Sequence, residues 1–134
     1  MRRLLRCLGL LAATMLALQP AAQAAETTKT ALQAFTRRQL ANSLVAGQLI
    51  FVDFDSTKIR SVVPRRNHPD IFYDSQAKLY ALCITATDDK GKEVPVDIYV
   101  KDTNGKLTLV DIIFGQHGRM GFMKFVQQGQ FKRI

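Results

Sequence analysis

Hydrophobic and polar residues alternate most regularly between residues 93 and 101. One side of this run carries Val94, Val96, Ile98 and Val100, and the other carries Glu93, Pro95, Asp97, Tyr99 and Lys101. This two-residue period is typical of a β-strand with one face packed and the other face in water. A polar turn at residues 88–92 precedes the strand, and Asn104-Gly105, a pair that favours a tight hairpin, follows it. The pattern predicts a three-stranded antiparallel meander over residues 78–114.

The two outer runs of this meander are apolar on both sides. In the first, Tyr80, Leu82, Ile84 and Ala86 alternate with Leu79, Ala81 and Cys83, and in the last, Val110, Ile112 and Phe114 alternate with Leu107, Leu109 and Ile113. Strands of this kind are covered on both faces or border a cavity.

An amphipathic helix is predicted for residues 27–46, which lack glycine and proline and precede Gly47. The residues that form its apolar stripe are Leu32, Phe35, Leu40 and Leu44, with Lys29, Arg37 and Arg38 largely outside the stripe. A helix with one apolar face can pack on a sheet, so the sequence predicts an α+β layered fold.

Three segments are less regular. Ile59, Val62 and Val63 predict a short strand or a turn of helix that Pro64 ends, and residues 65–70 are then expected to form a polar loop. Residues 115–119 are expected to form a flexible loop. Residues 120–128 predict a helix weakened by Gly121, and a strand within residues 119–134 is the alternative.

The N-terminus has the parts of a secretory signal peptide. Basic residues at positions 2, 3 and 6 precede an apolar run over residues 7–18, and Ala22-Gln23-Ala24 has small residues at the positions that a signal peptidase reads. The apolar run is shorter than the roughly 20 residues that a membrane-spanning helix needs. We therefore predict a signal peptide over residues 1–24, a single mature domain over residues 25–134 without an integral membrane segment, and a periplasmic or secreted location.

The net charge and the positions of the basic residues limit the classes of partner that the chain could bind. The formal net charge of the chain is +8, and it falls to +5 when Arg2, Arg3 and Arg6 are removed. A nucleic-acid surface would need aromatic residues among its basic ones, and none are interleaved with Arg37-Arg38 or Arg65-Arg66. Together with the predicted export, this excludes nucleic acid and leaves solubility or an anionic envelope component as reasons for the charge.

The cysteine and histidine residues of the mature chain do not indicate a catalytic site or a metal site. Cys83 is its single cysteine and lies in an apolar run, so we expect a buried apolar residue, with an intermolecular disulfide or a catalytic thiol as alternatives. His68 and His117 stand in predicted loops, without a second histidine at metal-ligand spacing. The sequence therefore predicts no metal site and no cofactor.

An Asp-x-Asp motif ends the apolar run that begins at Leu49. Asp53, Asp55 and Thr57 resemble the first motif of the haloacid dehalogenase-like phosphatases. This resemblance implies that Asp53 attacks phosphorus, that Asp55 is the general acid and base, and that Mg²⁺ bridges Asp53 to the phosphate. Those enzymes need a parallel sheet with crossover helices, whereas tight hairpins join antiparallel strands, which argues against a phosphatase.

Asp111 lies among aliphatic residues in the last run of the meander. On a regular strand it shares a face with Leu109 and Ile113, where an unpaired carboxylate has a raised pKa. In a curved sheet wrapped around a helix, such a carboxylate would be the general base of an isomerase-like pocket. The alternative is a carboxylate at a strand end that is paired with arginine or lies in water.

A series of short motifs runs through the last third of the chain. In order, they are Val94-Pro95-Val96-Asp97, Gly105, Val110-Asp111-Ile112, Phe122, Phe125-Val126 and Gly129-Gln130-Phe131. This order is similar to the end of the periplasmic phospholipid-carrier proteins of the MlaC type. The resemblance implies an NTF2-like or cystatin-like fold, in which a sheet curls around helices and encloses an apolar pocket for acyl chains.

The prediction is thus a single mature α+β domain, an N-terminal helix packed on a curved antiparallel sheet (NTF2-like or cystatin-like), with a C-terminal helix or strand. The favoured function is a noncatalytic binding module for an apolar small molecule or lipid, or for a protein of the cell envelope. The expected ligand-binding residues are Leu82, Ile112, Phe122, Met123 and Phe125. The alternative is a small enzyme, whose catalytic residues would be Asp53, Asp55 and Asp111.

Overall fold

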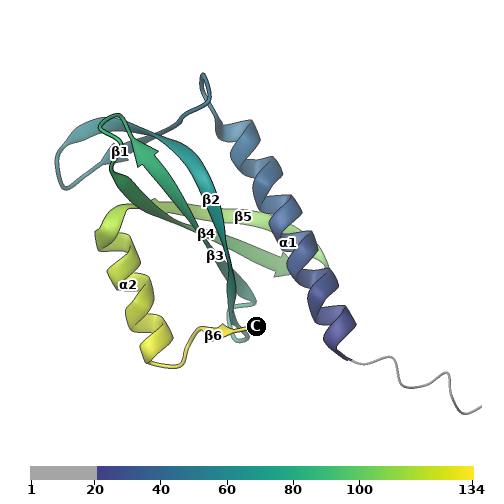
Figure 1. The fold of residues 1–134 in the computed structure, drawn as a ribbon. Helices are drawn as coiled ribbons and strands as arrows, with labels where there is room; N and C mark the ends of the chain where they lie inside the picture. The colour runs from purple at the N-terminus through teal and green to yellow at the C-terminus, as the bar shows by residue number, and fades with distance from the viewer. Residues whose placement is uncertain (1–20) are drawn as a thin grey trace, which may run out of the picture.

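The computed structural model describes residues 21–134, with side chains from residue 28 on, and has three layers (Figure 1). Strands β1 (Leu49–Asp53), β2 (Lys58–Asp74), β3 (Leu79–Asp88), β4 (Glu93–Thr103) and β5 (Lys106–Phe114) form one antiparallel sheet in chain order. A short strand, β6 (Lys132–Arg133), pairs with β2. Helix α1 (Ala21–Ser43) lies on one face of the sheet and α2 (Gly115–Gln127) on the other. The predicted signal peptide lies mostly outside the described residues.

The predicted meander is confirmed as β3, β4 and β5. On the side of α1, Val96, Ile98 and Val100 of β4 have no exposed surface, and they pack beside the inward residues of β3. The hairpin between β4 and β5 turns at Asn104 and Gly105, which have φ angles of 53° and 84°. These left-handed values are the ones that a tight two-residue hairpin requires.

The prediction that the other face of β4 lies in water is wrong. Asp97 is only 1% exposed, and Tyr99 is half-buried. Helix α2 covers this face, where Phe122 and Phe131 form a second core cluster with Ala81 and Cys83 of β3. The period-2 pattern therefore located the strand correctly, but the polar side of that strand is buried under a helix.

Helix α1 begins and ends earlier than expected. The residues of its stripe that pack on the sheet are Leu32, Phe35 and Leu40, whereas Leu44 lies beyond the helix and is exposed. Gly47 does not stop the helix: Ala46 and Gly47 have φ angles of 50° and 79° and make a tight turn between α1 and β1. The amphipathic helix is confirmed, and its predicted C-terminal end is wrong.

The predicted polar loop at residues 65–70 is wrong, because β2 continues through it. The pairing of β2 with β3 shifts register between Pro64 and Arg66 and again between Asn67 and Ile71. Such bulges accommodate proline, which lacks a backbone donor, within a strand. His68 is half-buried at the second irregularity, with Nε2 3.0 Å from the hydroxyl oxygen of Thr85.

The C-terminal segment contains both a helix and a strand. Helix α2 begins at Gly115, so the flexible loop expected at residues 115–119 is wrong, and β6 follows the helix. The α+β class is confirmed. The sheet is curled but not closed: the ring of Phe51 on β1 stacks on that of Phe114 on β5, with ring centroids 4.2 Å apart and planes within 3° of each other.

Two glycines of α2 offer a matched test of how closely this helix packs on the sheet. A Cβ at Gly118 would overlap Cγ2 of Ile113, whereas a Cβ at Gly121 would meet nothing within 4 Å. We expect Gly118→Ala to lower the free energy of unfolding by about 1–3 kcal/mol, the usual cost of overpacking. Gly121→Ala should raise it by up to about 1 kcal/mol, because alanine favours a helix. Urea denaturation measures both, and equal effects would contradict the close approach.

Candidate functional site

A hollow lined largely by apolar side chains lies between β1 and β5, two strands far apart in the sequence. Residues 51–55 line one wall, residues 111–114 line the other, and His117 and Gly118 of α2 also border it. Its volume is about 530 Å³, which is within the usual range of ligand-binding clefts. We call it the β1–β5 groove.

Next to the groove, the hairpin of β1 and β2 carries an exposed apolar surface. Its residues are Ile50, Val52, Phe54 and Ile59, which are 52%, 54%, 85% and 77% exposed. Val52 and Ile59 are cross-strand partners, so they lie on the same face of the sheet. We call these four residues the apolar hairpin face. Since Leu49 and Phe51 point to the α1 side, this face looks to the side of α2, which covers β4 and β5 but leaves the hairpin open.

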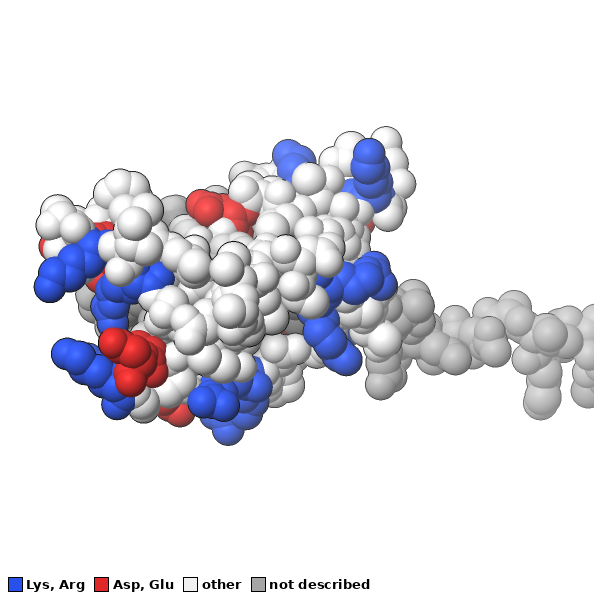
Figure 2. Space-filling model, turned by 90° about the horizontal axis from the view of Figure 1, so that it is seen from above, with Lys and Arg blue, Asp and Glu red and all other residues white. Residues whose placement is uncertain are grey.

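Charged side chains are unevenly spread over the surface. Seen from above, uncharged residues fill the centre of the view, and most lysine and arginine side chains project from its margins (Figure 2). Charged residues also lie beside the hairpin, where Lys58, Arg60 and Asp88 line a second hollow.

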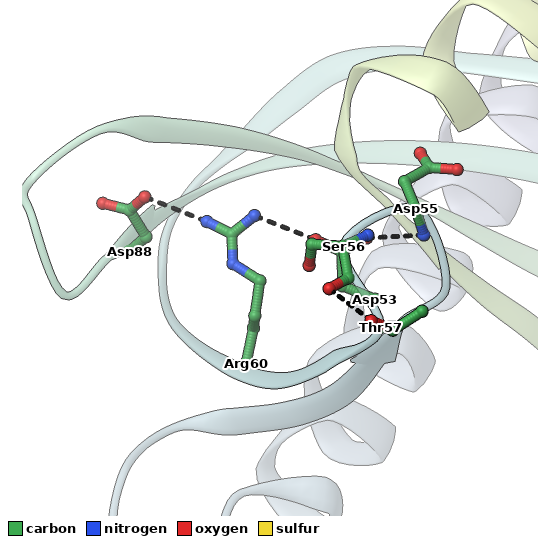
Figure 3. Close-up of polar contacts among 6 residues, drawn as sticks. All are labelled: Asp53, Asp55, Ser56, Thr57, Arg60 and Asp88. Carbon is green, nitrogen blue, oxygen red and sulfur yellow. Dashed lines mark hydrogen bonds and ion pairs between the residues drawn. The ribbon is translucent and has the colours of Figure 1, made fainter.

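A polar cluster fixes the tip of the same hairpin (Figure 3). Oδ1 of Asp53 accepts the backbone N–H groups of Asp55 and Ser56, at 3.2 and 3.4 Å, and the Ser56 hydroxyl donates to Oδ2 at 2.8 Å. Arg60 joins Asp53 to Asp88, the last residue of β3, at 3.1 and 3.2 Å. The hydrogen bond from Ser56, followed by that from Arg60, lowers the pKa of Asp53.

These contacts give Asp53 a structural role. A phosphatase nucleophile would need a free carboxylate oxygen at the end of a parallel strand, but both oxygens of Asp53 accept hydrogen bonds, and the described sheet is antiparallel. Asp55 points away from Arg60 (Figure 3) and is exposed. The structure therefore does not assemble the Asp-x-Asp chemistry that the motif suggested.

Asp111 lies in water, which was the alternative to an aliphatic environment. A bulge in β5 places Leu109 opposite Val100 but Asp111 opposite Tyr99, so Leu109 and Asp111 face different sides of the sheet. Asp111 is exposed, and its Oδ1 accepts the N–H of Ile112 at 2.8 Å. It borders the β1–β5 groove together with Asp53 and Asp55, so the three predicted catalytic residues do lie around one hollow. Within residues 21–134, however, no group of three or more His, Cys, Asp or Glu side chains is arranged to hold a metal ion.

The five predicted ligand-binding residues do not form one site. Leu82 and Ile112 belong to the core cluster on the α1 side, whereas Phe122 is buried in the cluster under α2. Met123 and Phe125 are 40% and 45% exposed on α2 itself. The sheet separates the first pair from the other three residues.

The hollow beside Leu82, between α1 and the sheet, is also small. It has a volume of about 10 Å³ and is lined by Thr36, His68 and Leu82, among others. That is at most the space that one water molecule needs, far less than an acyl chain would fill. The pocket implied by the resemblance to phospholipid carriers is thus not seen at this position.

A buried ion pair under α2 was not anticipated from the sequence. Nε of Arg119 donates to both carboxylate oxygens of Asp97, at 2.9 and 3.1 Å, and its Nη2 lies 2.7 Å from Oδ1. Burial raises the pKa of the nearby Cys83 thiol to about 12, an effect to which Asp97 adds. At neutral pH Cys83 is therefore a protonated, buried side chain, as its apolar run predicted, and not an activated nucleophile.

Three features were not anticipated from the sequence: the β1–β5 groove, the exposure of Phe54 and the burial of Asp97. The β1–β5 groove depends on the curl of the sheet, and no local pattern encodes that curl. The exposure of Phe54 could have been inferred from the sequence, because a large apolar residue is unusual at the polar tip of a hairpin. The covering of Asp97 could have been inferred from the apolar positions of α2, Phe122 and Val126, which need a face of the sheet to pack on.

No family model, curated protein or solved structure matches this chain. The resemblance to phospholipid carriers stays a prediction. Neither helix in residues 21–134 has the length and apolar character needed to cross a membrane.

Replacing Arg119 tests whether its ion pair with Asp97 stabilises the packing of α2 on the sheet. Arg119→Met leaves the Asp97 carboxylate, 1% exposed, without its partner, so the free energy of unfolding should fall by about 3–5 kcal/mol. Combining it with Asp97→Leu removes the unpaired charge and should restore much of the loss. Chemical denaturation of the wild type, both single variants and the double variant gives the coupling. Additive losses would contradict a direct pairing.

Acid should destabilise the fold through three carboxylates. Hydrogen bonds lower the folded-state pKa of each below the usual 3.8: from Ser56 to Asp53, from Gln130 to Asp74, and from the backbone of Lys92 to Asp88. Below about pH 4 the unfolded chain therefore binds protons first, and stability is lost until the folded carboxyls also protonate. Urea denaturation from pH 7 to pH 2.5 should show this fall, and Asp74→Asn should make it shallower. A flat profile would contradict the assigned hydrogen bonds.

Proposed function

We propose that this protein is a noncatalytic binding module that holds a protein partner on the apolar hairpin face and in the adjoining β1–β5 groove. The observation that carries the proposal is the exposure of Phe54, 85% accessible at the tip of a hairpin that a polar cluster holds in place. An exposed large aromatic side chain is costly to the free protein and is a typical anchor residue of a protein interface.

Three further observations support a protein over a lipid. The apolar surface is an open face beside an open groove, whereas a carried lipid needs an enclosed space for its chains. The hollow at Leu82 is too small for an acyl chain. The hairpin is rigidly built, with Arg60 bridging it to the end of β3, and a rigid surface loses little entropy on binding.

Location and fold family are part of the proposal. The N-terminal sequence favours export to the periplasm or beyond, where an envelope protein is the natural partner. A curled antiparallel sheet with a helix on its inner side is compatible with an NTF2-like or cystatin-like fold. In this proposal the apolar pocket of such folds is replaced by an external groove.

Native mass spectrometry of the protein purified from its own cells without detergent tests the proposal. We expect an added mass of protein size, and Phe54→Asp should abolish it by weakening binding by about 2 kcal/mol or more. Met123→Asp is the matched control, because Met123 is exposed on α2 outside the groove. An added mass of lipid size that Phe54→Asp leaves in place would support the carrier instead, and a bare chain would contradict both.

A further inference from the structure

The two walls of the β1–β5 groove are strand edges that no described strand pairs with. β1 pairs with β2 alone, and β5 pairs with β4 alone. Consecutive residues of each strand line the groove, 51–53 of β1 and 111–114 of β5, and Phe54 and Asp55 of the β1–β2 turn extend the first wall. Since alternate residues of a strand point to opposite faces, a hollow that touches consecutive residues runs along the strand edge, where backbone N–H and C=O groups lie free.

The curl of the sheet brings these edges toward each other without joining them. Phe51 and Phe114 stack across the gap on the α1 side, so the floor of the groove is a pair of aromatic rings. No backbone hydrogen bond between β1 and β5 is present among the described residues. The sheet is therefore rolled, with its two edges left unpaired.

The edge of β1 has few of the features that normally protect exposed edges, with Asp53 as its one charged residue. Its residues, Leu49–Asp53, include no lysine, no proline and no bulge. The other edge does have a bulge, at Val110, but this lies just before the part of β5 that lines the groove. Both edges are therefore able to accept a strand where they face each other.

The charges around the gap indicate what kind of strand fits. The groove is lined by Asp53, Asp55 and Asp111 and by no lysine or arginine, although the chain as a whole is basic. Arg60 already neutralises Asp53, which leaves Asp55 and Asp111 to meet a partner. A second copy of β1 would bring only Asp53 to these carboxylates, so like charges disfavour self-pairing.

We propose that the groove accepts an extended segment of a partner protein as an additional strand between β1 and β5. Apolar side chains of the segment pack on Phe51 and Phe114, and a lysine or arginine of the segment lies beside Asp55 and Asp111. The residues of β1 that line the groove, 51–53, give such a segment roughly 10 Å of edge at about 3.3 Å per residue, and β5 adds residues 111–114 on the other side. This inference rests on the proposed function, because it names the form and the chemistry of the partner.

The test uses a displayed library of random nine-residue peptides, panned on the full protein. Selected peptides should alternate apolar residues with lysine or arginine. Methylating alternate backbone nitrogens of a selected peptide should weaken binding at least about tenfold in one of the two alternations, because those N–H groups pair with a sheet edge. No enrichment, enrichment of peptides without basic residues, or indifference to methylation in both alternations would overturn the inference.

Variants of the groove residues distinguish the contribution of charge to peptide binding from that of backbone pairing. The double variant Asp55→Asn, Asp111→Asn should bind the selected peptide about tenfold more weakly and lose most of its salt dependence. Asp89→Asn, on the β3–β4 turn outside this groove, is the control and should bind normally. Equal effects of the double variant and the control would overturn the charge assignment.

The natural partner distinguishes this inference from the proposed function. If a partner is found by native mass spectrometry and lost in Phe54→Asp, but the selected peptide does not displace it, strand addition is wrong and the binding module stands. If the peptide binds by strand pairing and no natural partner is found, the groove is established and the proposed function is wrong.

Discussion

The fold depends on the burial of both faces of β3 and β4. Each of these central strands packs large aliphatic residues against α1 and a second set, including Ala81 and Cys83, against α2. A two-sided sheet needs a helix on each face, and this requirement explains why the buried charge of Asp97 must carry its own counter-ion. Arg119 supplies that counter-ion from α2, the helix that buries Asp97. The same helix therefore removes Asp97 from water and provides the positive charge that offsets this desolvation.

The same requirement explains where the surface is incomplete. Helix α2 is short and covers β4 and β5, so the outer face of the β1–β2 hairpin has no cover. The exposed apolar residues of the hairpin therefore follow from a sheet that is wider than its second helix. A surface left open in this way is available to a partner without any rearrangement of the core.

The sequence predicted what is local and missed what depends on assembly. Alternation located β3, β4 and β5, and the stripe of Leu32 and Leu40 located α1, because these patterns follow from the geometry of one element. Pro64 concealed the length of β2, since a bulge that tolerates proline depends on the neighbouring strand. The bulge in β5 that separates Asp111 from Leu109, and leaves it on the face of Ile113, also depends on the neighbouring strand. The groove joins residues that only the curl of the sheet brings together.

Strand order has a further consequence, for the way the chain folds. Every strand from β1 to β5 pairs with its neighbours in sequence, and the pairing of β6 with β2 is the distant one in the described sheet. Hairpins of this kind close short loops and form quickly, each providing an edge for the next. A chain synthesised from its N-terminus would form these strands in the order in which they pair, and the pairing of β6 with β2 would come last.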